Sequence, residues 1–144
     1  MDRNKVREIV LKRLRANSRF SLSELSRETK IPLQALLAAS RRAEKEAVVR
    51  YTSILEPKNM GYSIKVNFLL KARDGRTREF LETHQNINNC SRLMDDGLFY
   101  AECFFRDMKE LEVFKDTVIG MGTKILDEAF VTEELKREGF MCDV

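Results

Sequence analysis

The sequence predicts an α+β fold in two parts: a winged helix-turn-helix over residues 1–56 and a ferredoxin-like βαββαβ domain over residues 57–144. Charge separates the two parts, because residues 1–60 carry fourteen Lys and Arg against seven Asp and Glu, a net charge of +7. The remaining residues carry twelve against sixteen, a net charge of −4. Apolar residues recur at helical spacing in the first part, whereas strand and helix patterns alternate in the second. A basic segment joined to an acidic one is typical of a polyanion-binding module, and nucleic acid is the first candidate.

Three helices are expected in the first part. A stripe at i, i+3, i+4 and i+8 predicts the first helix and consists of Val6, Ile9, Val10 and Leu14. Ser21 followed by Glu24 forms a capping box that opens a second, short helix. Pro32 suits the first turn of a third helix that runs to Glu46, because proline lacks an amide hydrogen and has a fixed φ. The inner face of this third helix is expected to comprise Leu33, Leu36, Leu37 and Ser40.

The outer face of the third helix carries the features that a DNA reader needs. A helix fits the major groove of B-form DNA when its outer face offers hydrogen-bond donors and small residues. Residues 48–55 are rich in β-branched and aromatic side chains and predict a strand or wing after this helix. The residues predicted to contact DNA are Arg19, Ser21, Gln34, Ala35, Ala38, Arg41, Arg42, Lys45 and Arg50. A solvated basic face on a small helical bundle is the alternative interpretation of this charge.

The second part alternates strands and helices in the order β-α-β-β-α-β. Strands are expected over residues 64–71, 89–93, 98–106 and 124–132, and the first helix over residues 77–84. Asp107 and Glu110 predict the start of the second helix. Apolar residues occupy both faces of the third strand, so we expect the sheet face opposite the helices to be covered as well. We infer dimerisation through the sheet, because exposed apolar patches of that size are uncommon on monomers.

The sequence contains few residues that could form a disulfide, metal-binding or catalytic site. The cysteines Cys90, Cys103 and Cys142 are odd in number and widely spaced, and His84 is the only histidine, so neither a disulfide framework nor a zinc site is expected. A Ser/His/Asp set and a phosphate-cradling glycine loop are also missing from the sequence. We therefore predict no catalytic residue, no metal ligand and no cofactor.

The hydropathy pattern favours a cytoplasmic protein. No apolar run approaches the roughly 20 residues needed to cross a bilayer, so no membrane partner is expected. The charged start, Asp2 and Arg3 among its first residues, does not follow the pattern of a secretory signal.

Five segments resemble the Lrp/AsnC family of "feast/famine" transcription regulators, and together they span nearly the whole chain. They are residues 21–26, 48–51, 56–62, 96–100 and 106–111. The most specific is the acidic-Pro-x-x-apolar-Gly junction Glu56-Pro57-Lys58-Asn59-Met60-Gly61. The resemblance implies a regulator that binds double-stranded DNA through its helix-turn-helix and senses a small metabolite, such as an amino acid, through its second domain. It also implies homodimers that assemble into tetramers or octamers, with effectors bound at interfaces between sensing domains.

Two departures from the family pattern affect the site residues. Ala39-Ser40 stands where the family usually has Arg-Ile, so base contacts of the third helix cannot be copied from the family. The family's Gly-x-Tyr-Asp turn corresponds to residues 97–100, which lack the acid, and Asp95 and Asp96 are the candidates to replace it. The effector-binding residues implied in this way are Asp95, Asp96, Gly97, Phe99 and Tyr100.

Two other functions compete with a metabolite-responsive regulator. The siroheme decarboxylases, which act on a tetrapyrrole, have a similar two-domain layout. Their catalysis calls for well-placed histidines and arginines, and His84 is the only histidine in this chain. An architectural DNA binder without an effector would use the sheet domain only for assembly. We favour the regulator and predict that the chain is not an enzyme.

Overall fold

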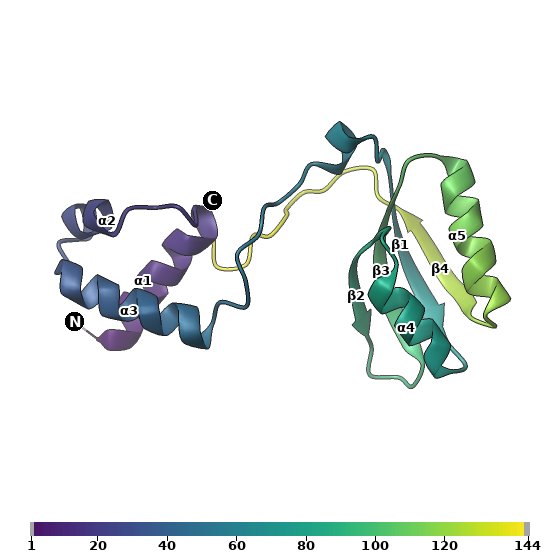
Figure 1. The fold of residues 1–144 in the computed structure, drawn as a ribbon, viewed down its shortest axis with the longest axis horizontal. Helices are drawn as coiled ribbons and strands as arrows, with labels where there is room; N and C mark the ends of the chain where they lie inside the picture. Colours follow the sequence, from purple (N-terminus) through teal and green to yellow (C-terminus); the bar gives the residue numbers. More distant parts are fainter. Residues whose placement is uncertain (1, 143–144) are drawn as a thin grey trace. The chain divides into compact units, whose positions relative to one another are not determined.

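The computed structural model describes residues 2–142 and divides the chain into two compact units (Figure 1). The head unit comprises the residues up to Ile54 together with the segment that begins at Leu135, and the sheet unit comprises Leu55–Glu134. The sequence predicts a boundary after residue 56, with all later residues in the second domain. The structure instead groups residues 135–142 with the head, because their contacts are with its first helix.

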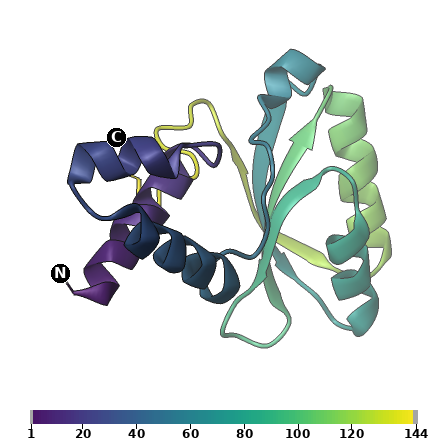
Figure 2. The ribbon, with the colours of Figure 1, turned by 60° about the vertical axis from the view of Figure 1, so that its left-hand side comes forward.

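The head unit is built from three helices, α1 (Arg3–Ala16), α2 (Leu22–Thr29) and α3 (Leu33–Glu46). Figure 2 shows α1, in purple, packed across the blue α3. The Ser21 hydroxyl accepts a hydrogen bond from the Glu24 amide at 3.4 Å, which confirms the predicted start of α2. The core of the head consists of Val6, Val10, Leu25, Ile31, Leu36 and Ala43.

Two expectations for the head are wrong. The sequence predicts that Leu33 faces inward, but this first residue of α3 is 38% exposed, whereas Ala43 is fully buried. The predicted wing is also missing, since residues 48–56 form no strand and Val49 is 96% exposed. A β-rich segment forms a ladder only beside another strand, and the described part of the head offers none.

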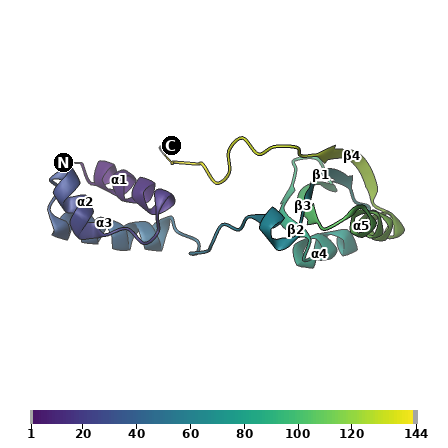
Figure 3. The same cartoon turned by 90° about the horizontal axis from the view of Figure 1, so that it is seen from above.

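The sheet unit confirms the predicted β-α-β-β-α-β order. Its elements are β1 (Ile64–Lys71), α4 (Gly75–Thr83), β2 (Ile87–Arg92), β3 (Leu98–Phe105), α5 (Met108–Gly120) and β4 (Lys124–Phe130). The four strands form an antiparallel sheet in the order β2-β3-β1-β4. Figure 3 shows α4 and α5 on the same side of this sheet.

The core of the sheet unit lies between the sheet and its two helices. Asp107 accepts a hydrogen bond from the Glu110 amide at 2.8 Å and caps α5 as predicted. The alternation of β1 places every second side chain in the core. The buried residues of this core are Val66, Phe68, Leu70, Leu81, Phe99, Ala101, Cys103, Phe105, Leu111, Phe114 and Val118.

The junction motif forms a tight turn ahead of the sheet. The short 3₁₀ helix η1 (Pro57–Met60) ends at Gly61, whose φ of +86° lies in the left-handed region that favours glycine. The Tyr62 amide donates to the Pro57 carbonyl at 3.0 Å, and the Arg106 guanidinium stacks 4.9 Å from the centre of the Tyr62 ring. The motif therefore fixes where the chain enters β1.

Candidate nucleic-acid interface and sensing face

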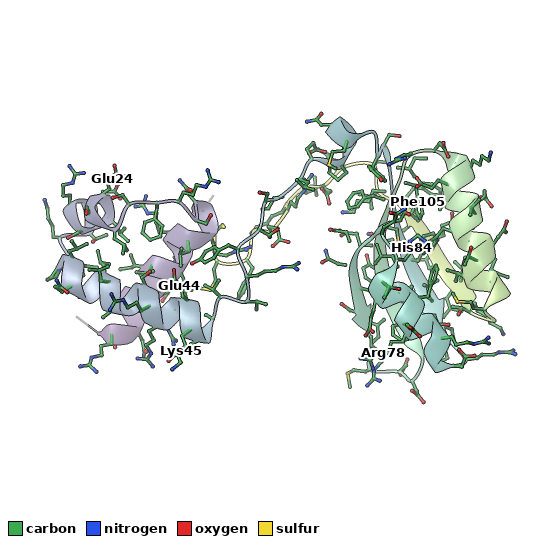
Figure 4. The ribbon with its side chains drawn as sticks, viewed as in Figure 1. Glu24, Glu44, Lys45, Arg78, His84 and Phe105 are labelled. Atoms are coloured by element: carbon green, nitrogen blue, oxygen red, sulfur yellow. The ribbon has the colours of Figure 1, made fainter. Side chains whose placement is uncertain are left out.

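The outer face of α3 presents all six predicted residues to solvent. This exposed face, which we call the α3 outer face, consists of Gln34, Ala35, Ala38, Arg41, Arg42 and Lys45. It exists because Leu36 and Ala43, two turns apart, turn the opposite side of the helix into the core. Figure 4 shows Lys45 and Glu44 leaving α3 on different sides. A cationic helix with alanines between its long side chains can approach a duplex closely.

The cations of the α3 outer face are not equivalent. Arg42 donates from Nε to the Glu46 carboxylate at 2.9 Å, and Arg7 of α1 donates to the other oxygen of that carboxylate at 3.0 Å. These hydrogen bonds, above all that from Arg42, hold the pKa of Glu46 below its usual value. Arg41 and Lys45 have no side-chain partner within residues 2–142. Two cations of the face are therefore available to an anion, whereas the third is shared with an acid.

The other three predicted DNA contacts flank α3. Arg19 is exposed in the turn before α2, and Ser21 uses its hydroxyl as an acceptor at the α2 cap while its O–H stays available as a donor. Arg50 is exposed in the irregular segment after α3. This segment is held to α3 by the Tyr51 hydroxyl, which donates to Glu44 at 2.8 Å, and that hydrogen bond raises the pKa of Tyr51. Arg7 and Glu46 are not among the residues predicted from the sequence, although the i, i+4 spacing of Arg42 and Glu46 indicates their ion pair.

The five residues implied as effector contacts do not converge in one chain. Asp95 and Asp96 are exposed in the turn between β2 and β3, and Gly97 has a φ of +71° with the Ala72 carbonyl oxygen only 2.6 Å from where a Cβ would lie. Phe99 is 8% exposed in the core, whereas Tyr100 is 42% exposed on the opposite face of the sheet. The two aromatic side chains therefore cannot contact the same ligand within a single chain.

The sheet face opposite the helices carries a partly buried ion-pair cluster that the sequence did not reveal. Lys65 has a side-chain exposure of only 13%, with Nζ 3.1 Å from the Glu102 carboxylate and bonded also to Glu134. Burial lowers the pKa of Lys65, but the hydrogen bonds to both carboxylates outweigh it and the pKa is raised overall. Nearby on the same strand, the buried Oδ1 of Asn67 has no hydrogen-bond partner within the described residues. We call this face, which carries Lys65, Asn67 and Tyr100, the open sheet face. It therefore combines apolar surface with a polar centre.

His84 and Cys103 are the side chains that could take part in catalysis, and both are packed among neighbouring residues of the sheet unit. The His84 ring lies 4.8 Å from Phe80 and 5.1 Å from Phe114 between ring centres, and its Nδ1 accepts from the Asn86 amide at 3.2 Å. Burial lowers the pKa of His84, although the Glu110 carboxylate opposes this shift, and so favours the neutral ring. Burial also raises the pKa of Cys103 to about 12, which makes this thiol a poor nucleophile.

Within residues 2–142, no three His, Cys, Asp or Glu side chains are grouped so that they could hold a metal ion. None of the described helices is long and apolar enough to cross a membrane.

Both units together match solved structures of transcriptional regulators. A regulator of Neisseria meningitidis in complex with L-Met has a TM-score of 0.79 at 22% identity and covers 95% of this chain and 93% of its own. A feast or famine regulatory protein of M. tuberculosis complexed with L-methionine gives 0.78 at 16% identity, covering 92% and 94%. An AsnC family regulator of Agrobacterium tumefaciens gives 0.76 at 17% identity, covering 95% and 94%.

The chain has the fold of these regulators. The fold class expected from the sequence is thus confirmed across the head and the sheet, apart from the wing. Neither a protein-family model nor a curated protein matches the sequence.

Proposed function

We propose that this chain is a transcription regulator of the Lrp/AsnC family that binds double-stranded DNA through α3 and senses a small metabolite through its sheet unit. The observation that carries the proposal is the match to solved regulators over 92–95% of the chain, which includes both the reading helix and the sheet. The exposed cationic face of α3 supports it independently. The segment pattern noted in the sequence, above all the Glu56–Gly61 junction, adds a third line of support.

DNA binding follows from the chemistry of the α3 outer face. Arg41, Arg42 and Lys45 would contact phosphates, since each is a long cation on the exposed side of the helix. Gln34, near the start of α3, would reach base edges, because a carboxamide pairs with the N6 and N7 atoms of adenine. Arg19, Ser21 and Arg50 would add phosphate contacts on either side of the reading helix. The protein would act in the cytoplasm, where such a regulator meets its DNA.

Assembly would use the open sheet face. A second copy packed on it would cover the exposed ring of Tyr100. A two-fold dimer presents two reading heads and therefore matches a palindromic operator. Further assembly into tetramers or octamers would place more heads on longer sites.

The effector would bind between sheet units rather than within one. Asp95 and Asp96 offer carboxylates for the ammonium group of an amino acid, and Gly97 lets the turn approach Ala72 closely. Tyr100 would contact the ligand from the open face, while Phe99 supports the turn from the core. The effector would change DNA binding by favouring one assembly over another, which requires a different affinity for the two.

Selection of binding sites from random duplexes, followed by footprinting, tests the proposal. We expect enrichment of a palindromic sequence with half-sites about 10 base pairs or a multiple apart. No enrichment above that of a protein without a DNA-binding surface would overturn it. Calorimetry with the twenty amino acids then separates a sensor, which shows heat with at least one of them, from an architectural binder, which shows none.

The enzyme hypothesis would depend on His84, the only histidine of the sequence. His84 is partly buried, packs against Phe80 and Phe114 and uses Nδ1 to accept from the backbone. Tetrapyrrole absorbance in the purified protein would nevertheless favour the enzyme and count against the regulator.

A further inference from the structure

The head unit contains a segment that lies far from it in sequence. Residues 135–142 follow the last strand of the sheet, yet they group with the three head helices. We propose that this C-terminal segment is docked on α1 by Arg15, so that two stretches of chain, rather than one, attach each reading head to its sheet unit. The consequences for DNA rest on the proposed function, whereas the docking itself does not.

Arg15 gives the segment a specific anchor. Its Nε donates to the Phe140 carbonyl at 3.0 Å, and its Nη2 donates to the Glu138 carbonyl and, at 3.3 Å, to the Glu138 carboxylate. A planar guanidinium suits this arrangement because it presents several N–H donors in a fixed fork. Two of the three acceptors are backbone carbonyls, so the docking depends on the path of the segment as well as on its side chains.

Two backbone angles indicate that the C-terminal segment has a defined conformation. Glu138 has a φ of +49° and Met141 a φ of +59°, and both are non-glycine residues in the left-handed region. Such residues persist only where their surroundings fix them, since the conformation costs free energy. One further hydrogen bond closes the turn, from the Cys142 amide to the Gly139 carbonyl at 3.2 Å. Met141 lines a hollow beside α1 that Leu11 also lines.

A second attachment restricts the head. The chain leaves the head after Ile54 and rejoins it at Leu135, so the sheet unit forms a closed loop whose two ends belong to one body. Closing a loop removes conformational freedom from the parts that it joins. Heads held at two points should therefore tolerate fewer half-site spacings on DNA than heads held by residues 47–56 alone.

Three variants, two substitutions and one truncation, separate the possibilities. Arg15→Gln removes the anchor. A chain that ends at Glu134 removes the C-terminal segment but keeps Glu134, which pairs with Lys65. Arg13→Gln is the matched control, because Arg13 lies on the same helix and pairs with Glu28 of the head instead.

Nitrogen-15 relaxation should give order parameters near 0.8 for residues 138–142 in the wild type and in Arg13→Gln. The same residues should fall below about 0.6 in Arg15→Gln. Flexible values in the wild type, or rigid ones in Arg15→Gln, would overturn the docking.

DNA with variable spacing tests the second attachment. Duplexes that carry two selected half-sites are lengthened between them by one to five base pairs, and the affinity of each protein is measured. We expect the wild type and Arg13→Gln to lose at least tenfold in affinity on the out-of-phase duplexes, and the truncated chain and Arg15→Gln to lose less than threefold. Equal losses in all four proteins would overturn the two-point attachment. If the wild type binds no duplex at all, the proposed function fails while the relaxation result still decides the docking.

Discussion

Glu46 holds Arg42 in an ion pair one helical turn away, with Arg42 Nε 2.9 Å from a carboxylate oxygen. The same carboxylate accepts from Arg7 of α1 at 3.0 Å. The Glu46 carboxylate therefore forms ion pairs with two cations of the head unit, and one of them, Arg42, lies on the α3 outer face. A phosphate that contacts Arg42 must compete with Glu46, so this acid should weaken DNA binding.

Replacing Glu46 by Gln should raise affinity for duplex DNA. The change removes a negative charge beside the reading face and frees Arg42 and Arg7 from their shared acid, so the affinity for DNA should rise severalfold. Fluorescence anisotropy with a labelled duplex measures it. Glu82→Gln is the control, because Glu82 also pairs with an arginine four residues away but belongs to the sheet unit. Equal affinities for wild type and Glu46→Gln would show that Arg42 does not reach the DNA.

Leu36 and Leu33 should differ sharply in their contribution to stability. Leu36 is fully buried in the head core, so Leu36→Ala should lower the free energy of unfolding of the head by about 2–5 kcal/mol. Leu33→Ala should cost less than about 1 kcal/mol, since its side chain is already 38% exposed. Urea denaturation followed by circular dichroism compares the two. Similar losses would mean that Leu33 faces inward, as the sequence pattern alone suggested.

Stability should fall in mild acid through His84. Burial lowers the pKa of His84 in the folded protein below 6.5, so the unfolded chain takes up the proton first. The contribution of the neutral ring is therefore fully present above about pH 6.5 and is lost as the pH falls from there through the lower, folded pKa. His84→Phe should have a flatter dependence of unfolding free energy on pH between 7.5 and 5. A slope as steep as that of the wild type would assign the effect to other groups.

Removing Lys65 should destabilise the sheet unit. Lys65→Met leaves the Glu102 and Glu134 carboxylates close together and partly buried without their shared cation. Loss of one partner of a buried pair costs about 3–5 kcal/mol, and partial exposure reduces our expectation to about 1–3 kcal/mol. Lys124→Met, at an exposed position of the same sheet, should stay within about 0.5 kcal/mol of the wild type. A Lys65→Met protein as stable as that control would contradict the role assigned to the cluster.

The features that the sequence predicted correctly depend on neighbours along the chain. The caps Ser21 and Asp107 act on amides three residues away, and the alternation of β1 follows from one buried face. These signals fixed most of the fold and placed the six residues of the α3 outer face on one exposed surface.

The features that it missed depend on tertiary contacts. Val49 and its neighbours have the composition of a strand, but a strand also needs a partner. The cluster around Lys65 requires the pairing of β1 with β3, which sets Lys65 beside Phe104 and near Glu102. The anchor at Arg15 joins residues more than 120 positions apart, partly through backbone carbonyls that no sequence motif marks.

The salt dependence of duplex binding tests the central claim most directly. Binding constants of the wild type and of Arg41→Ala/Arg42→Ala are measured on one selected duplex between about 50 and 200 mM salt, and their logarithms are plotted against the logarithm of the salt concentration. We predict that the double variant has a slope smaller by about two, because each lost phosphate contact removes about 0.9. Two parallel lines with the same affinity would contradict the assignment of α3 as the reading helix.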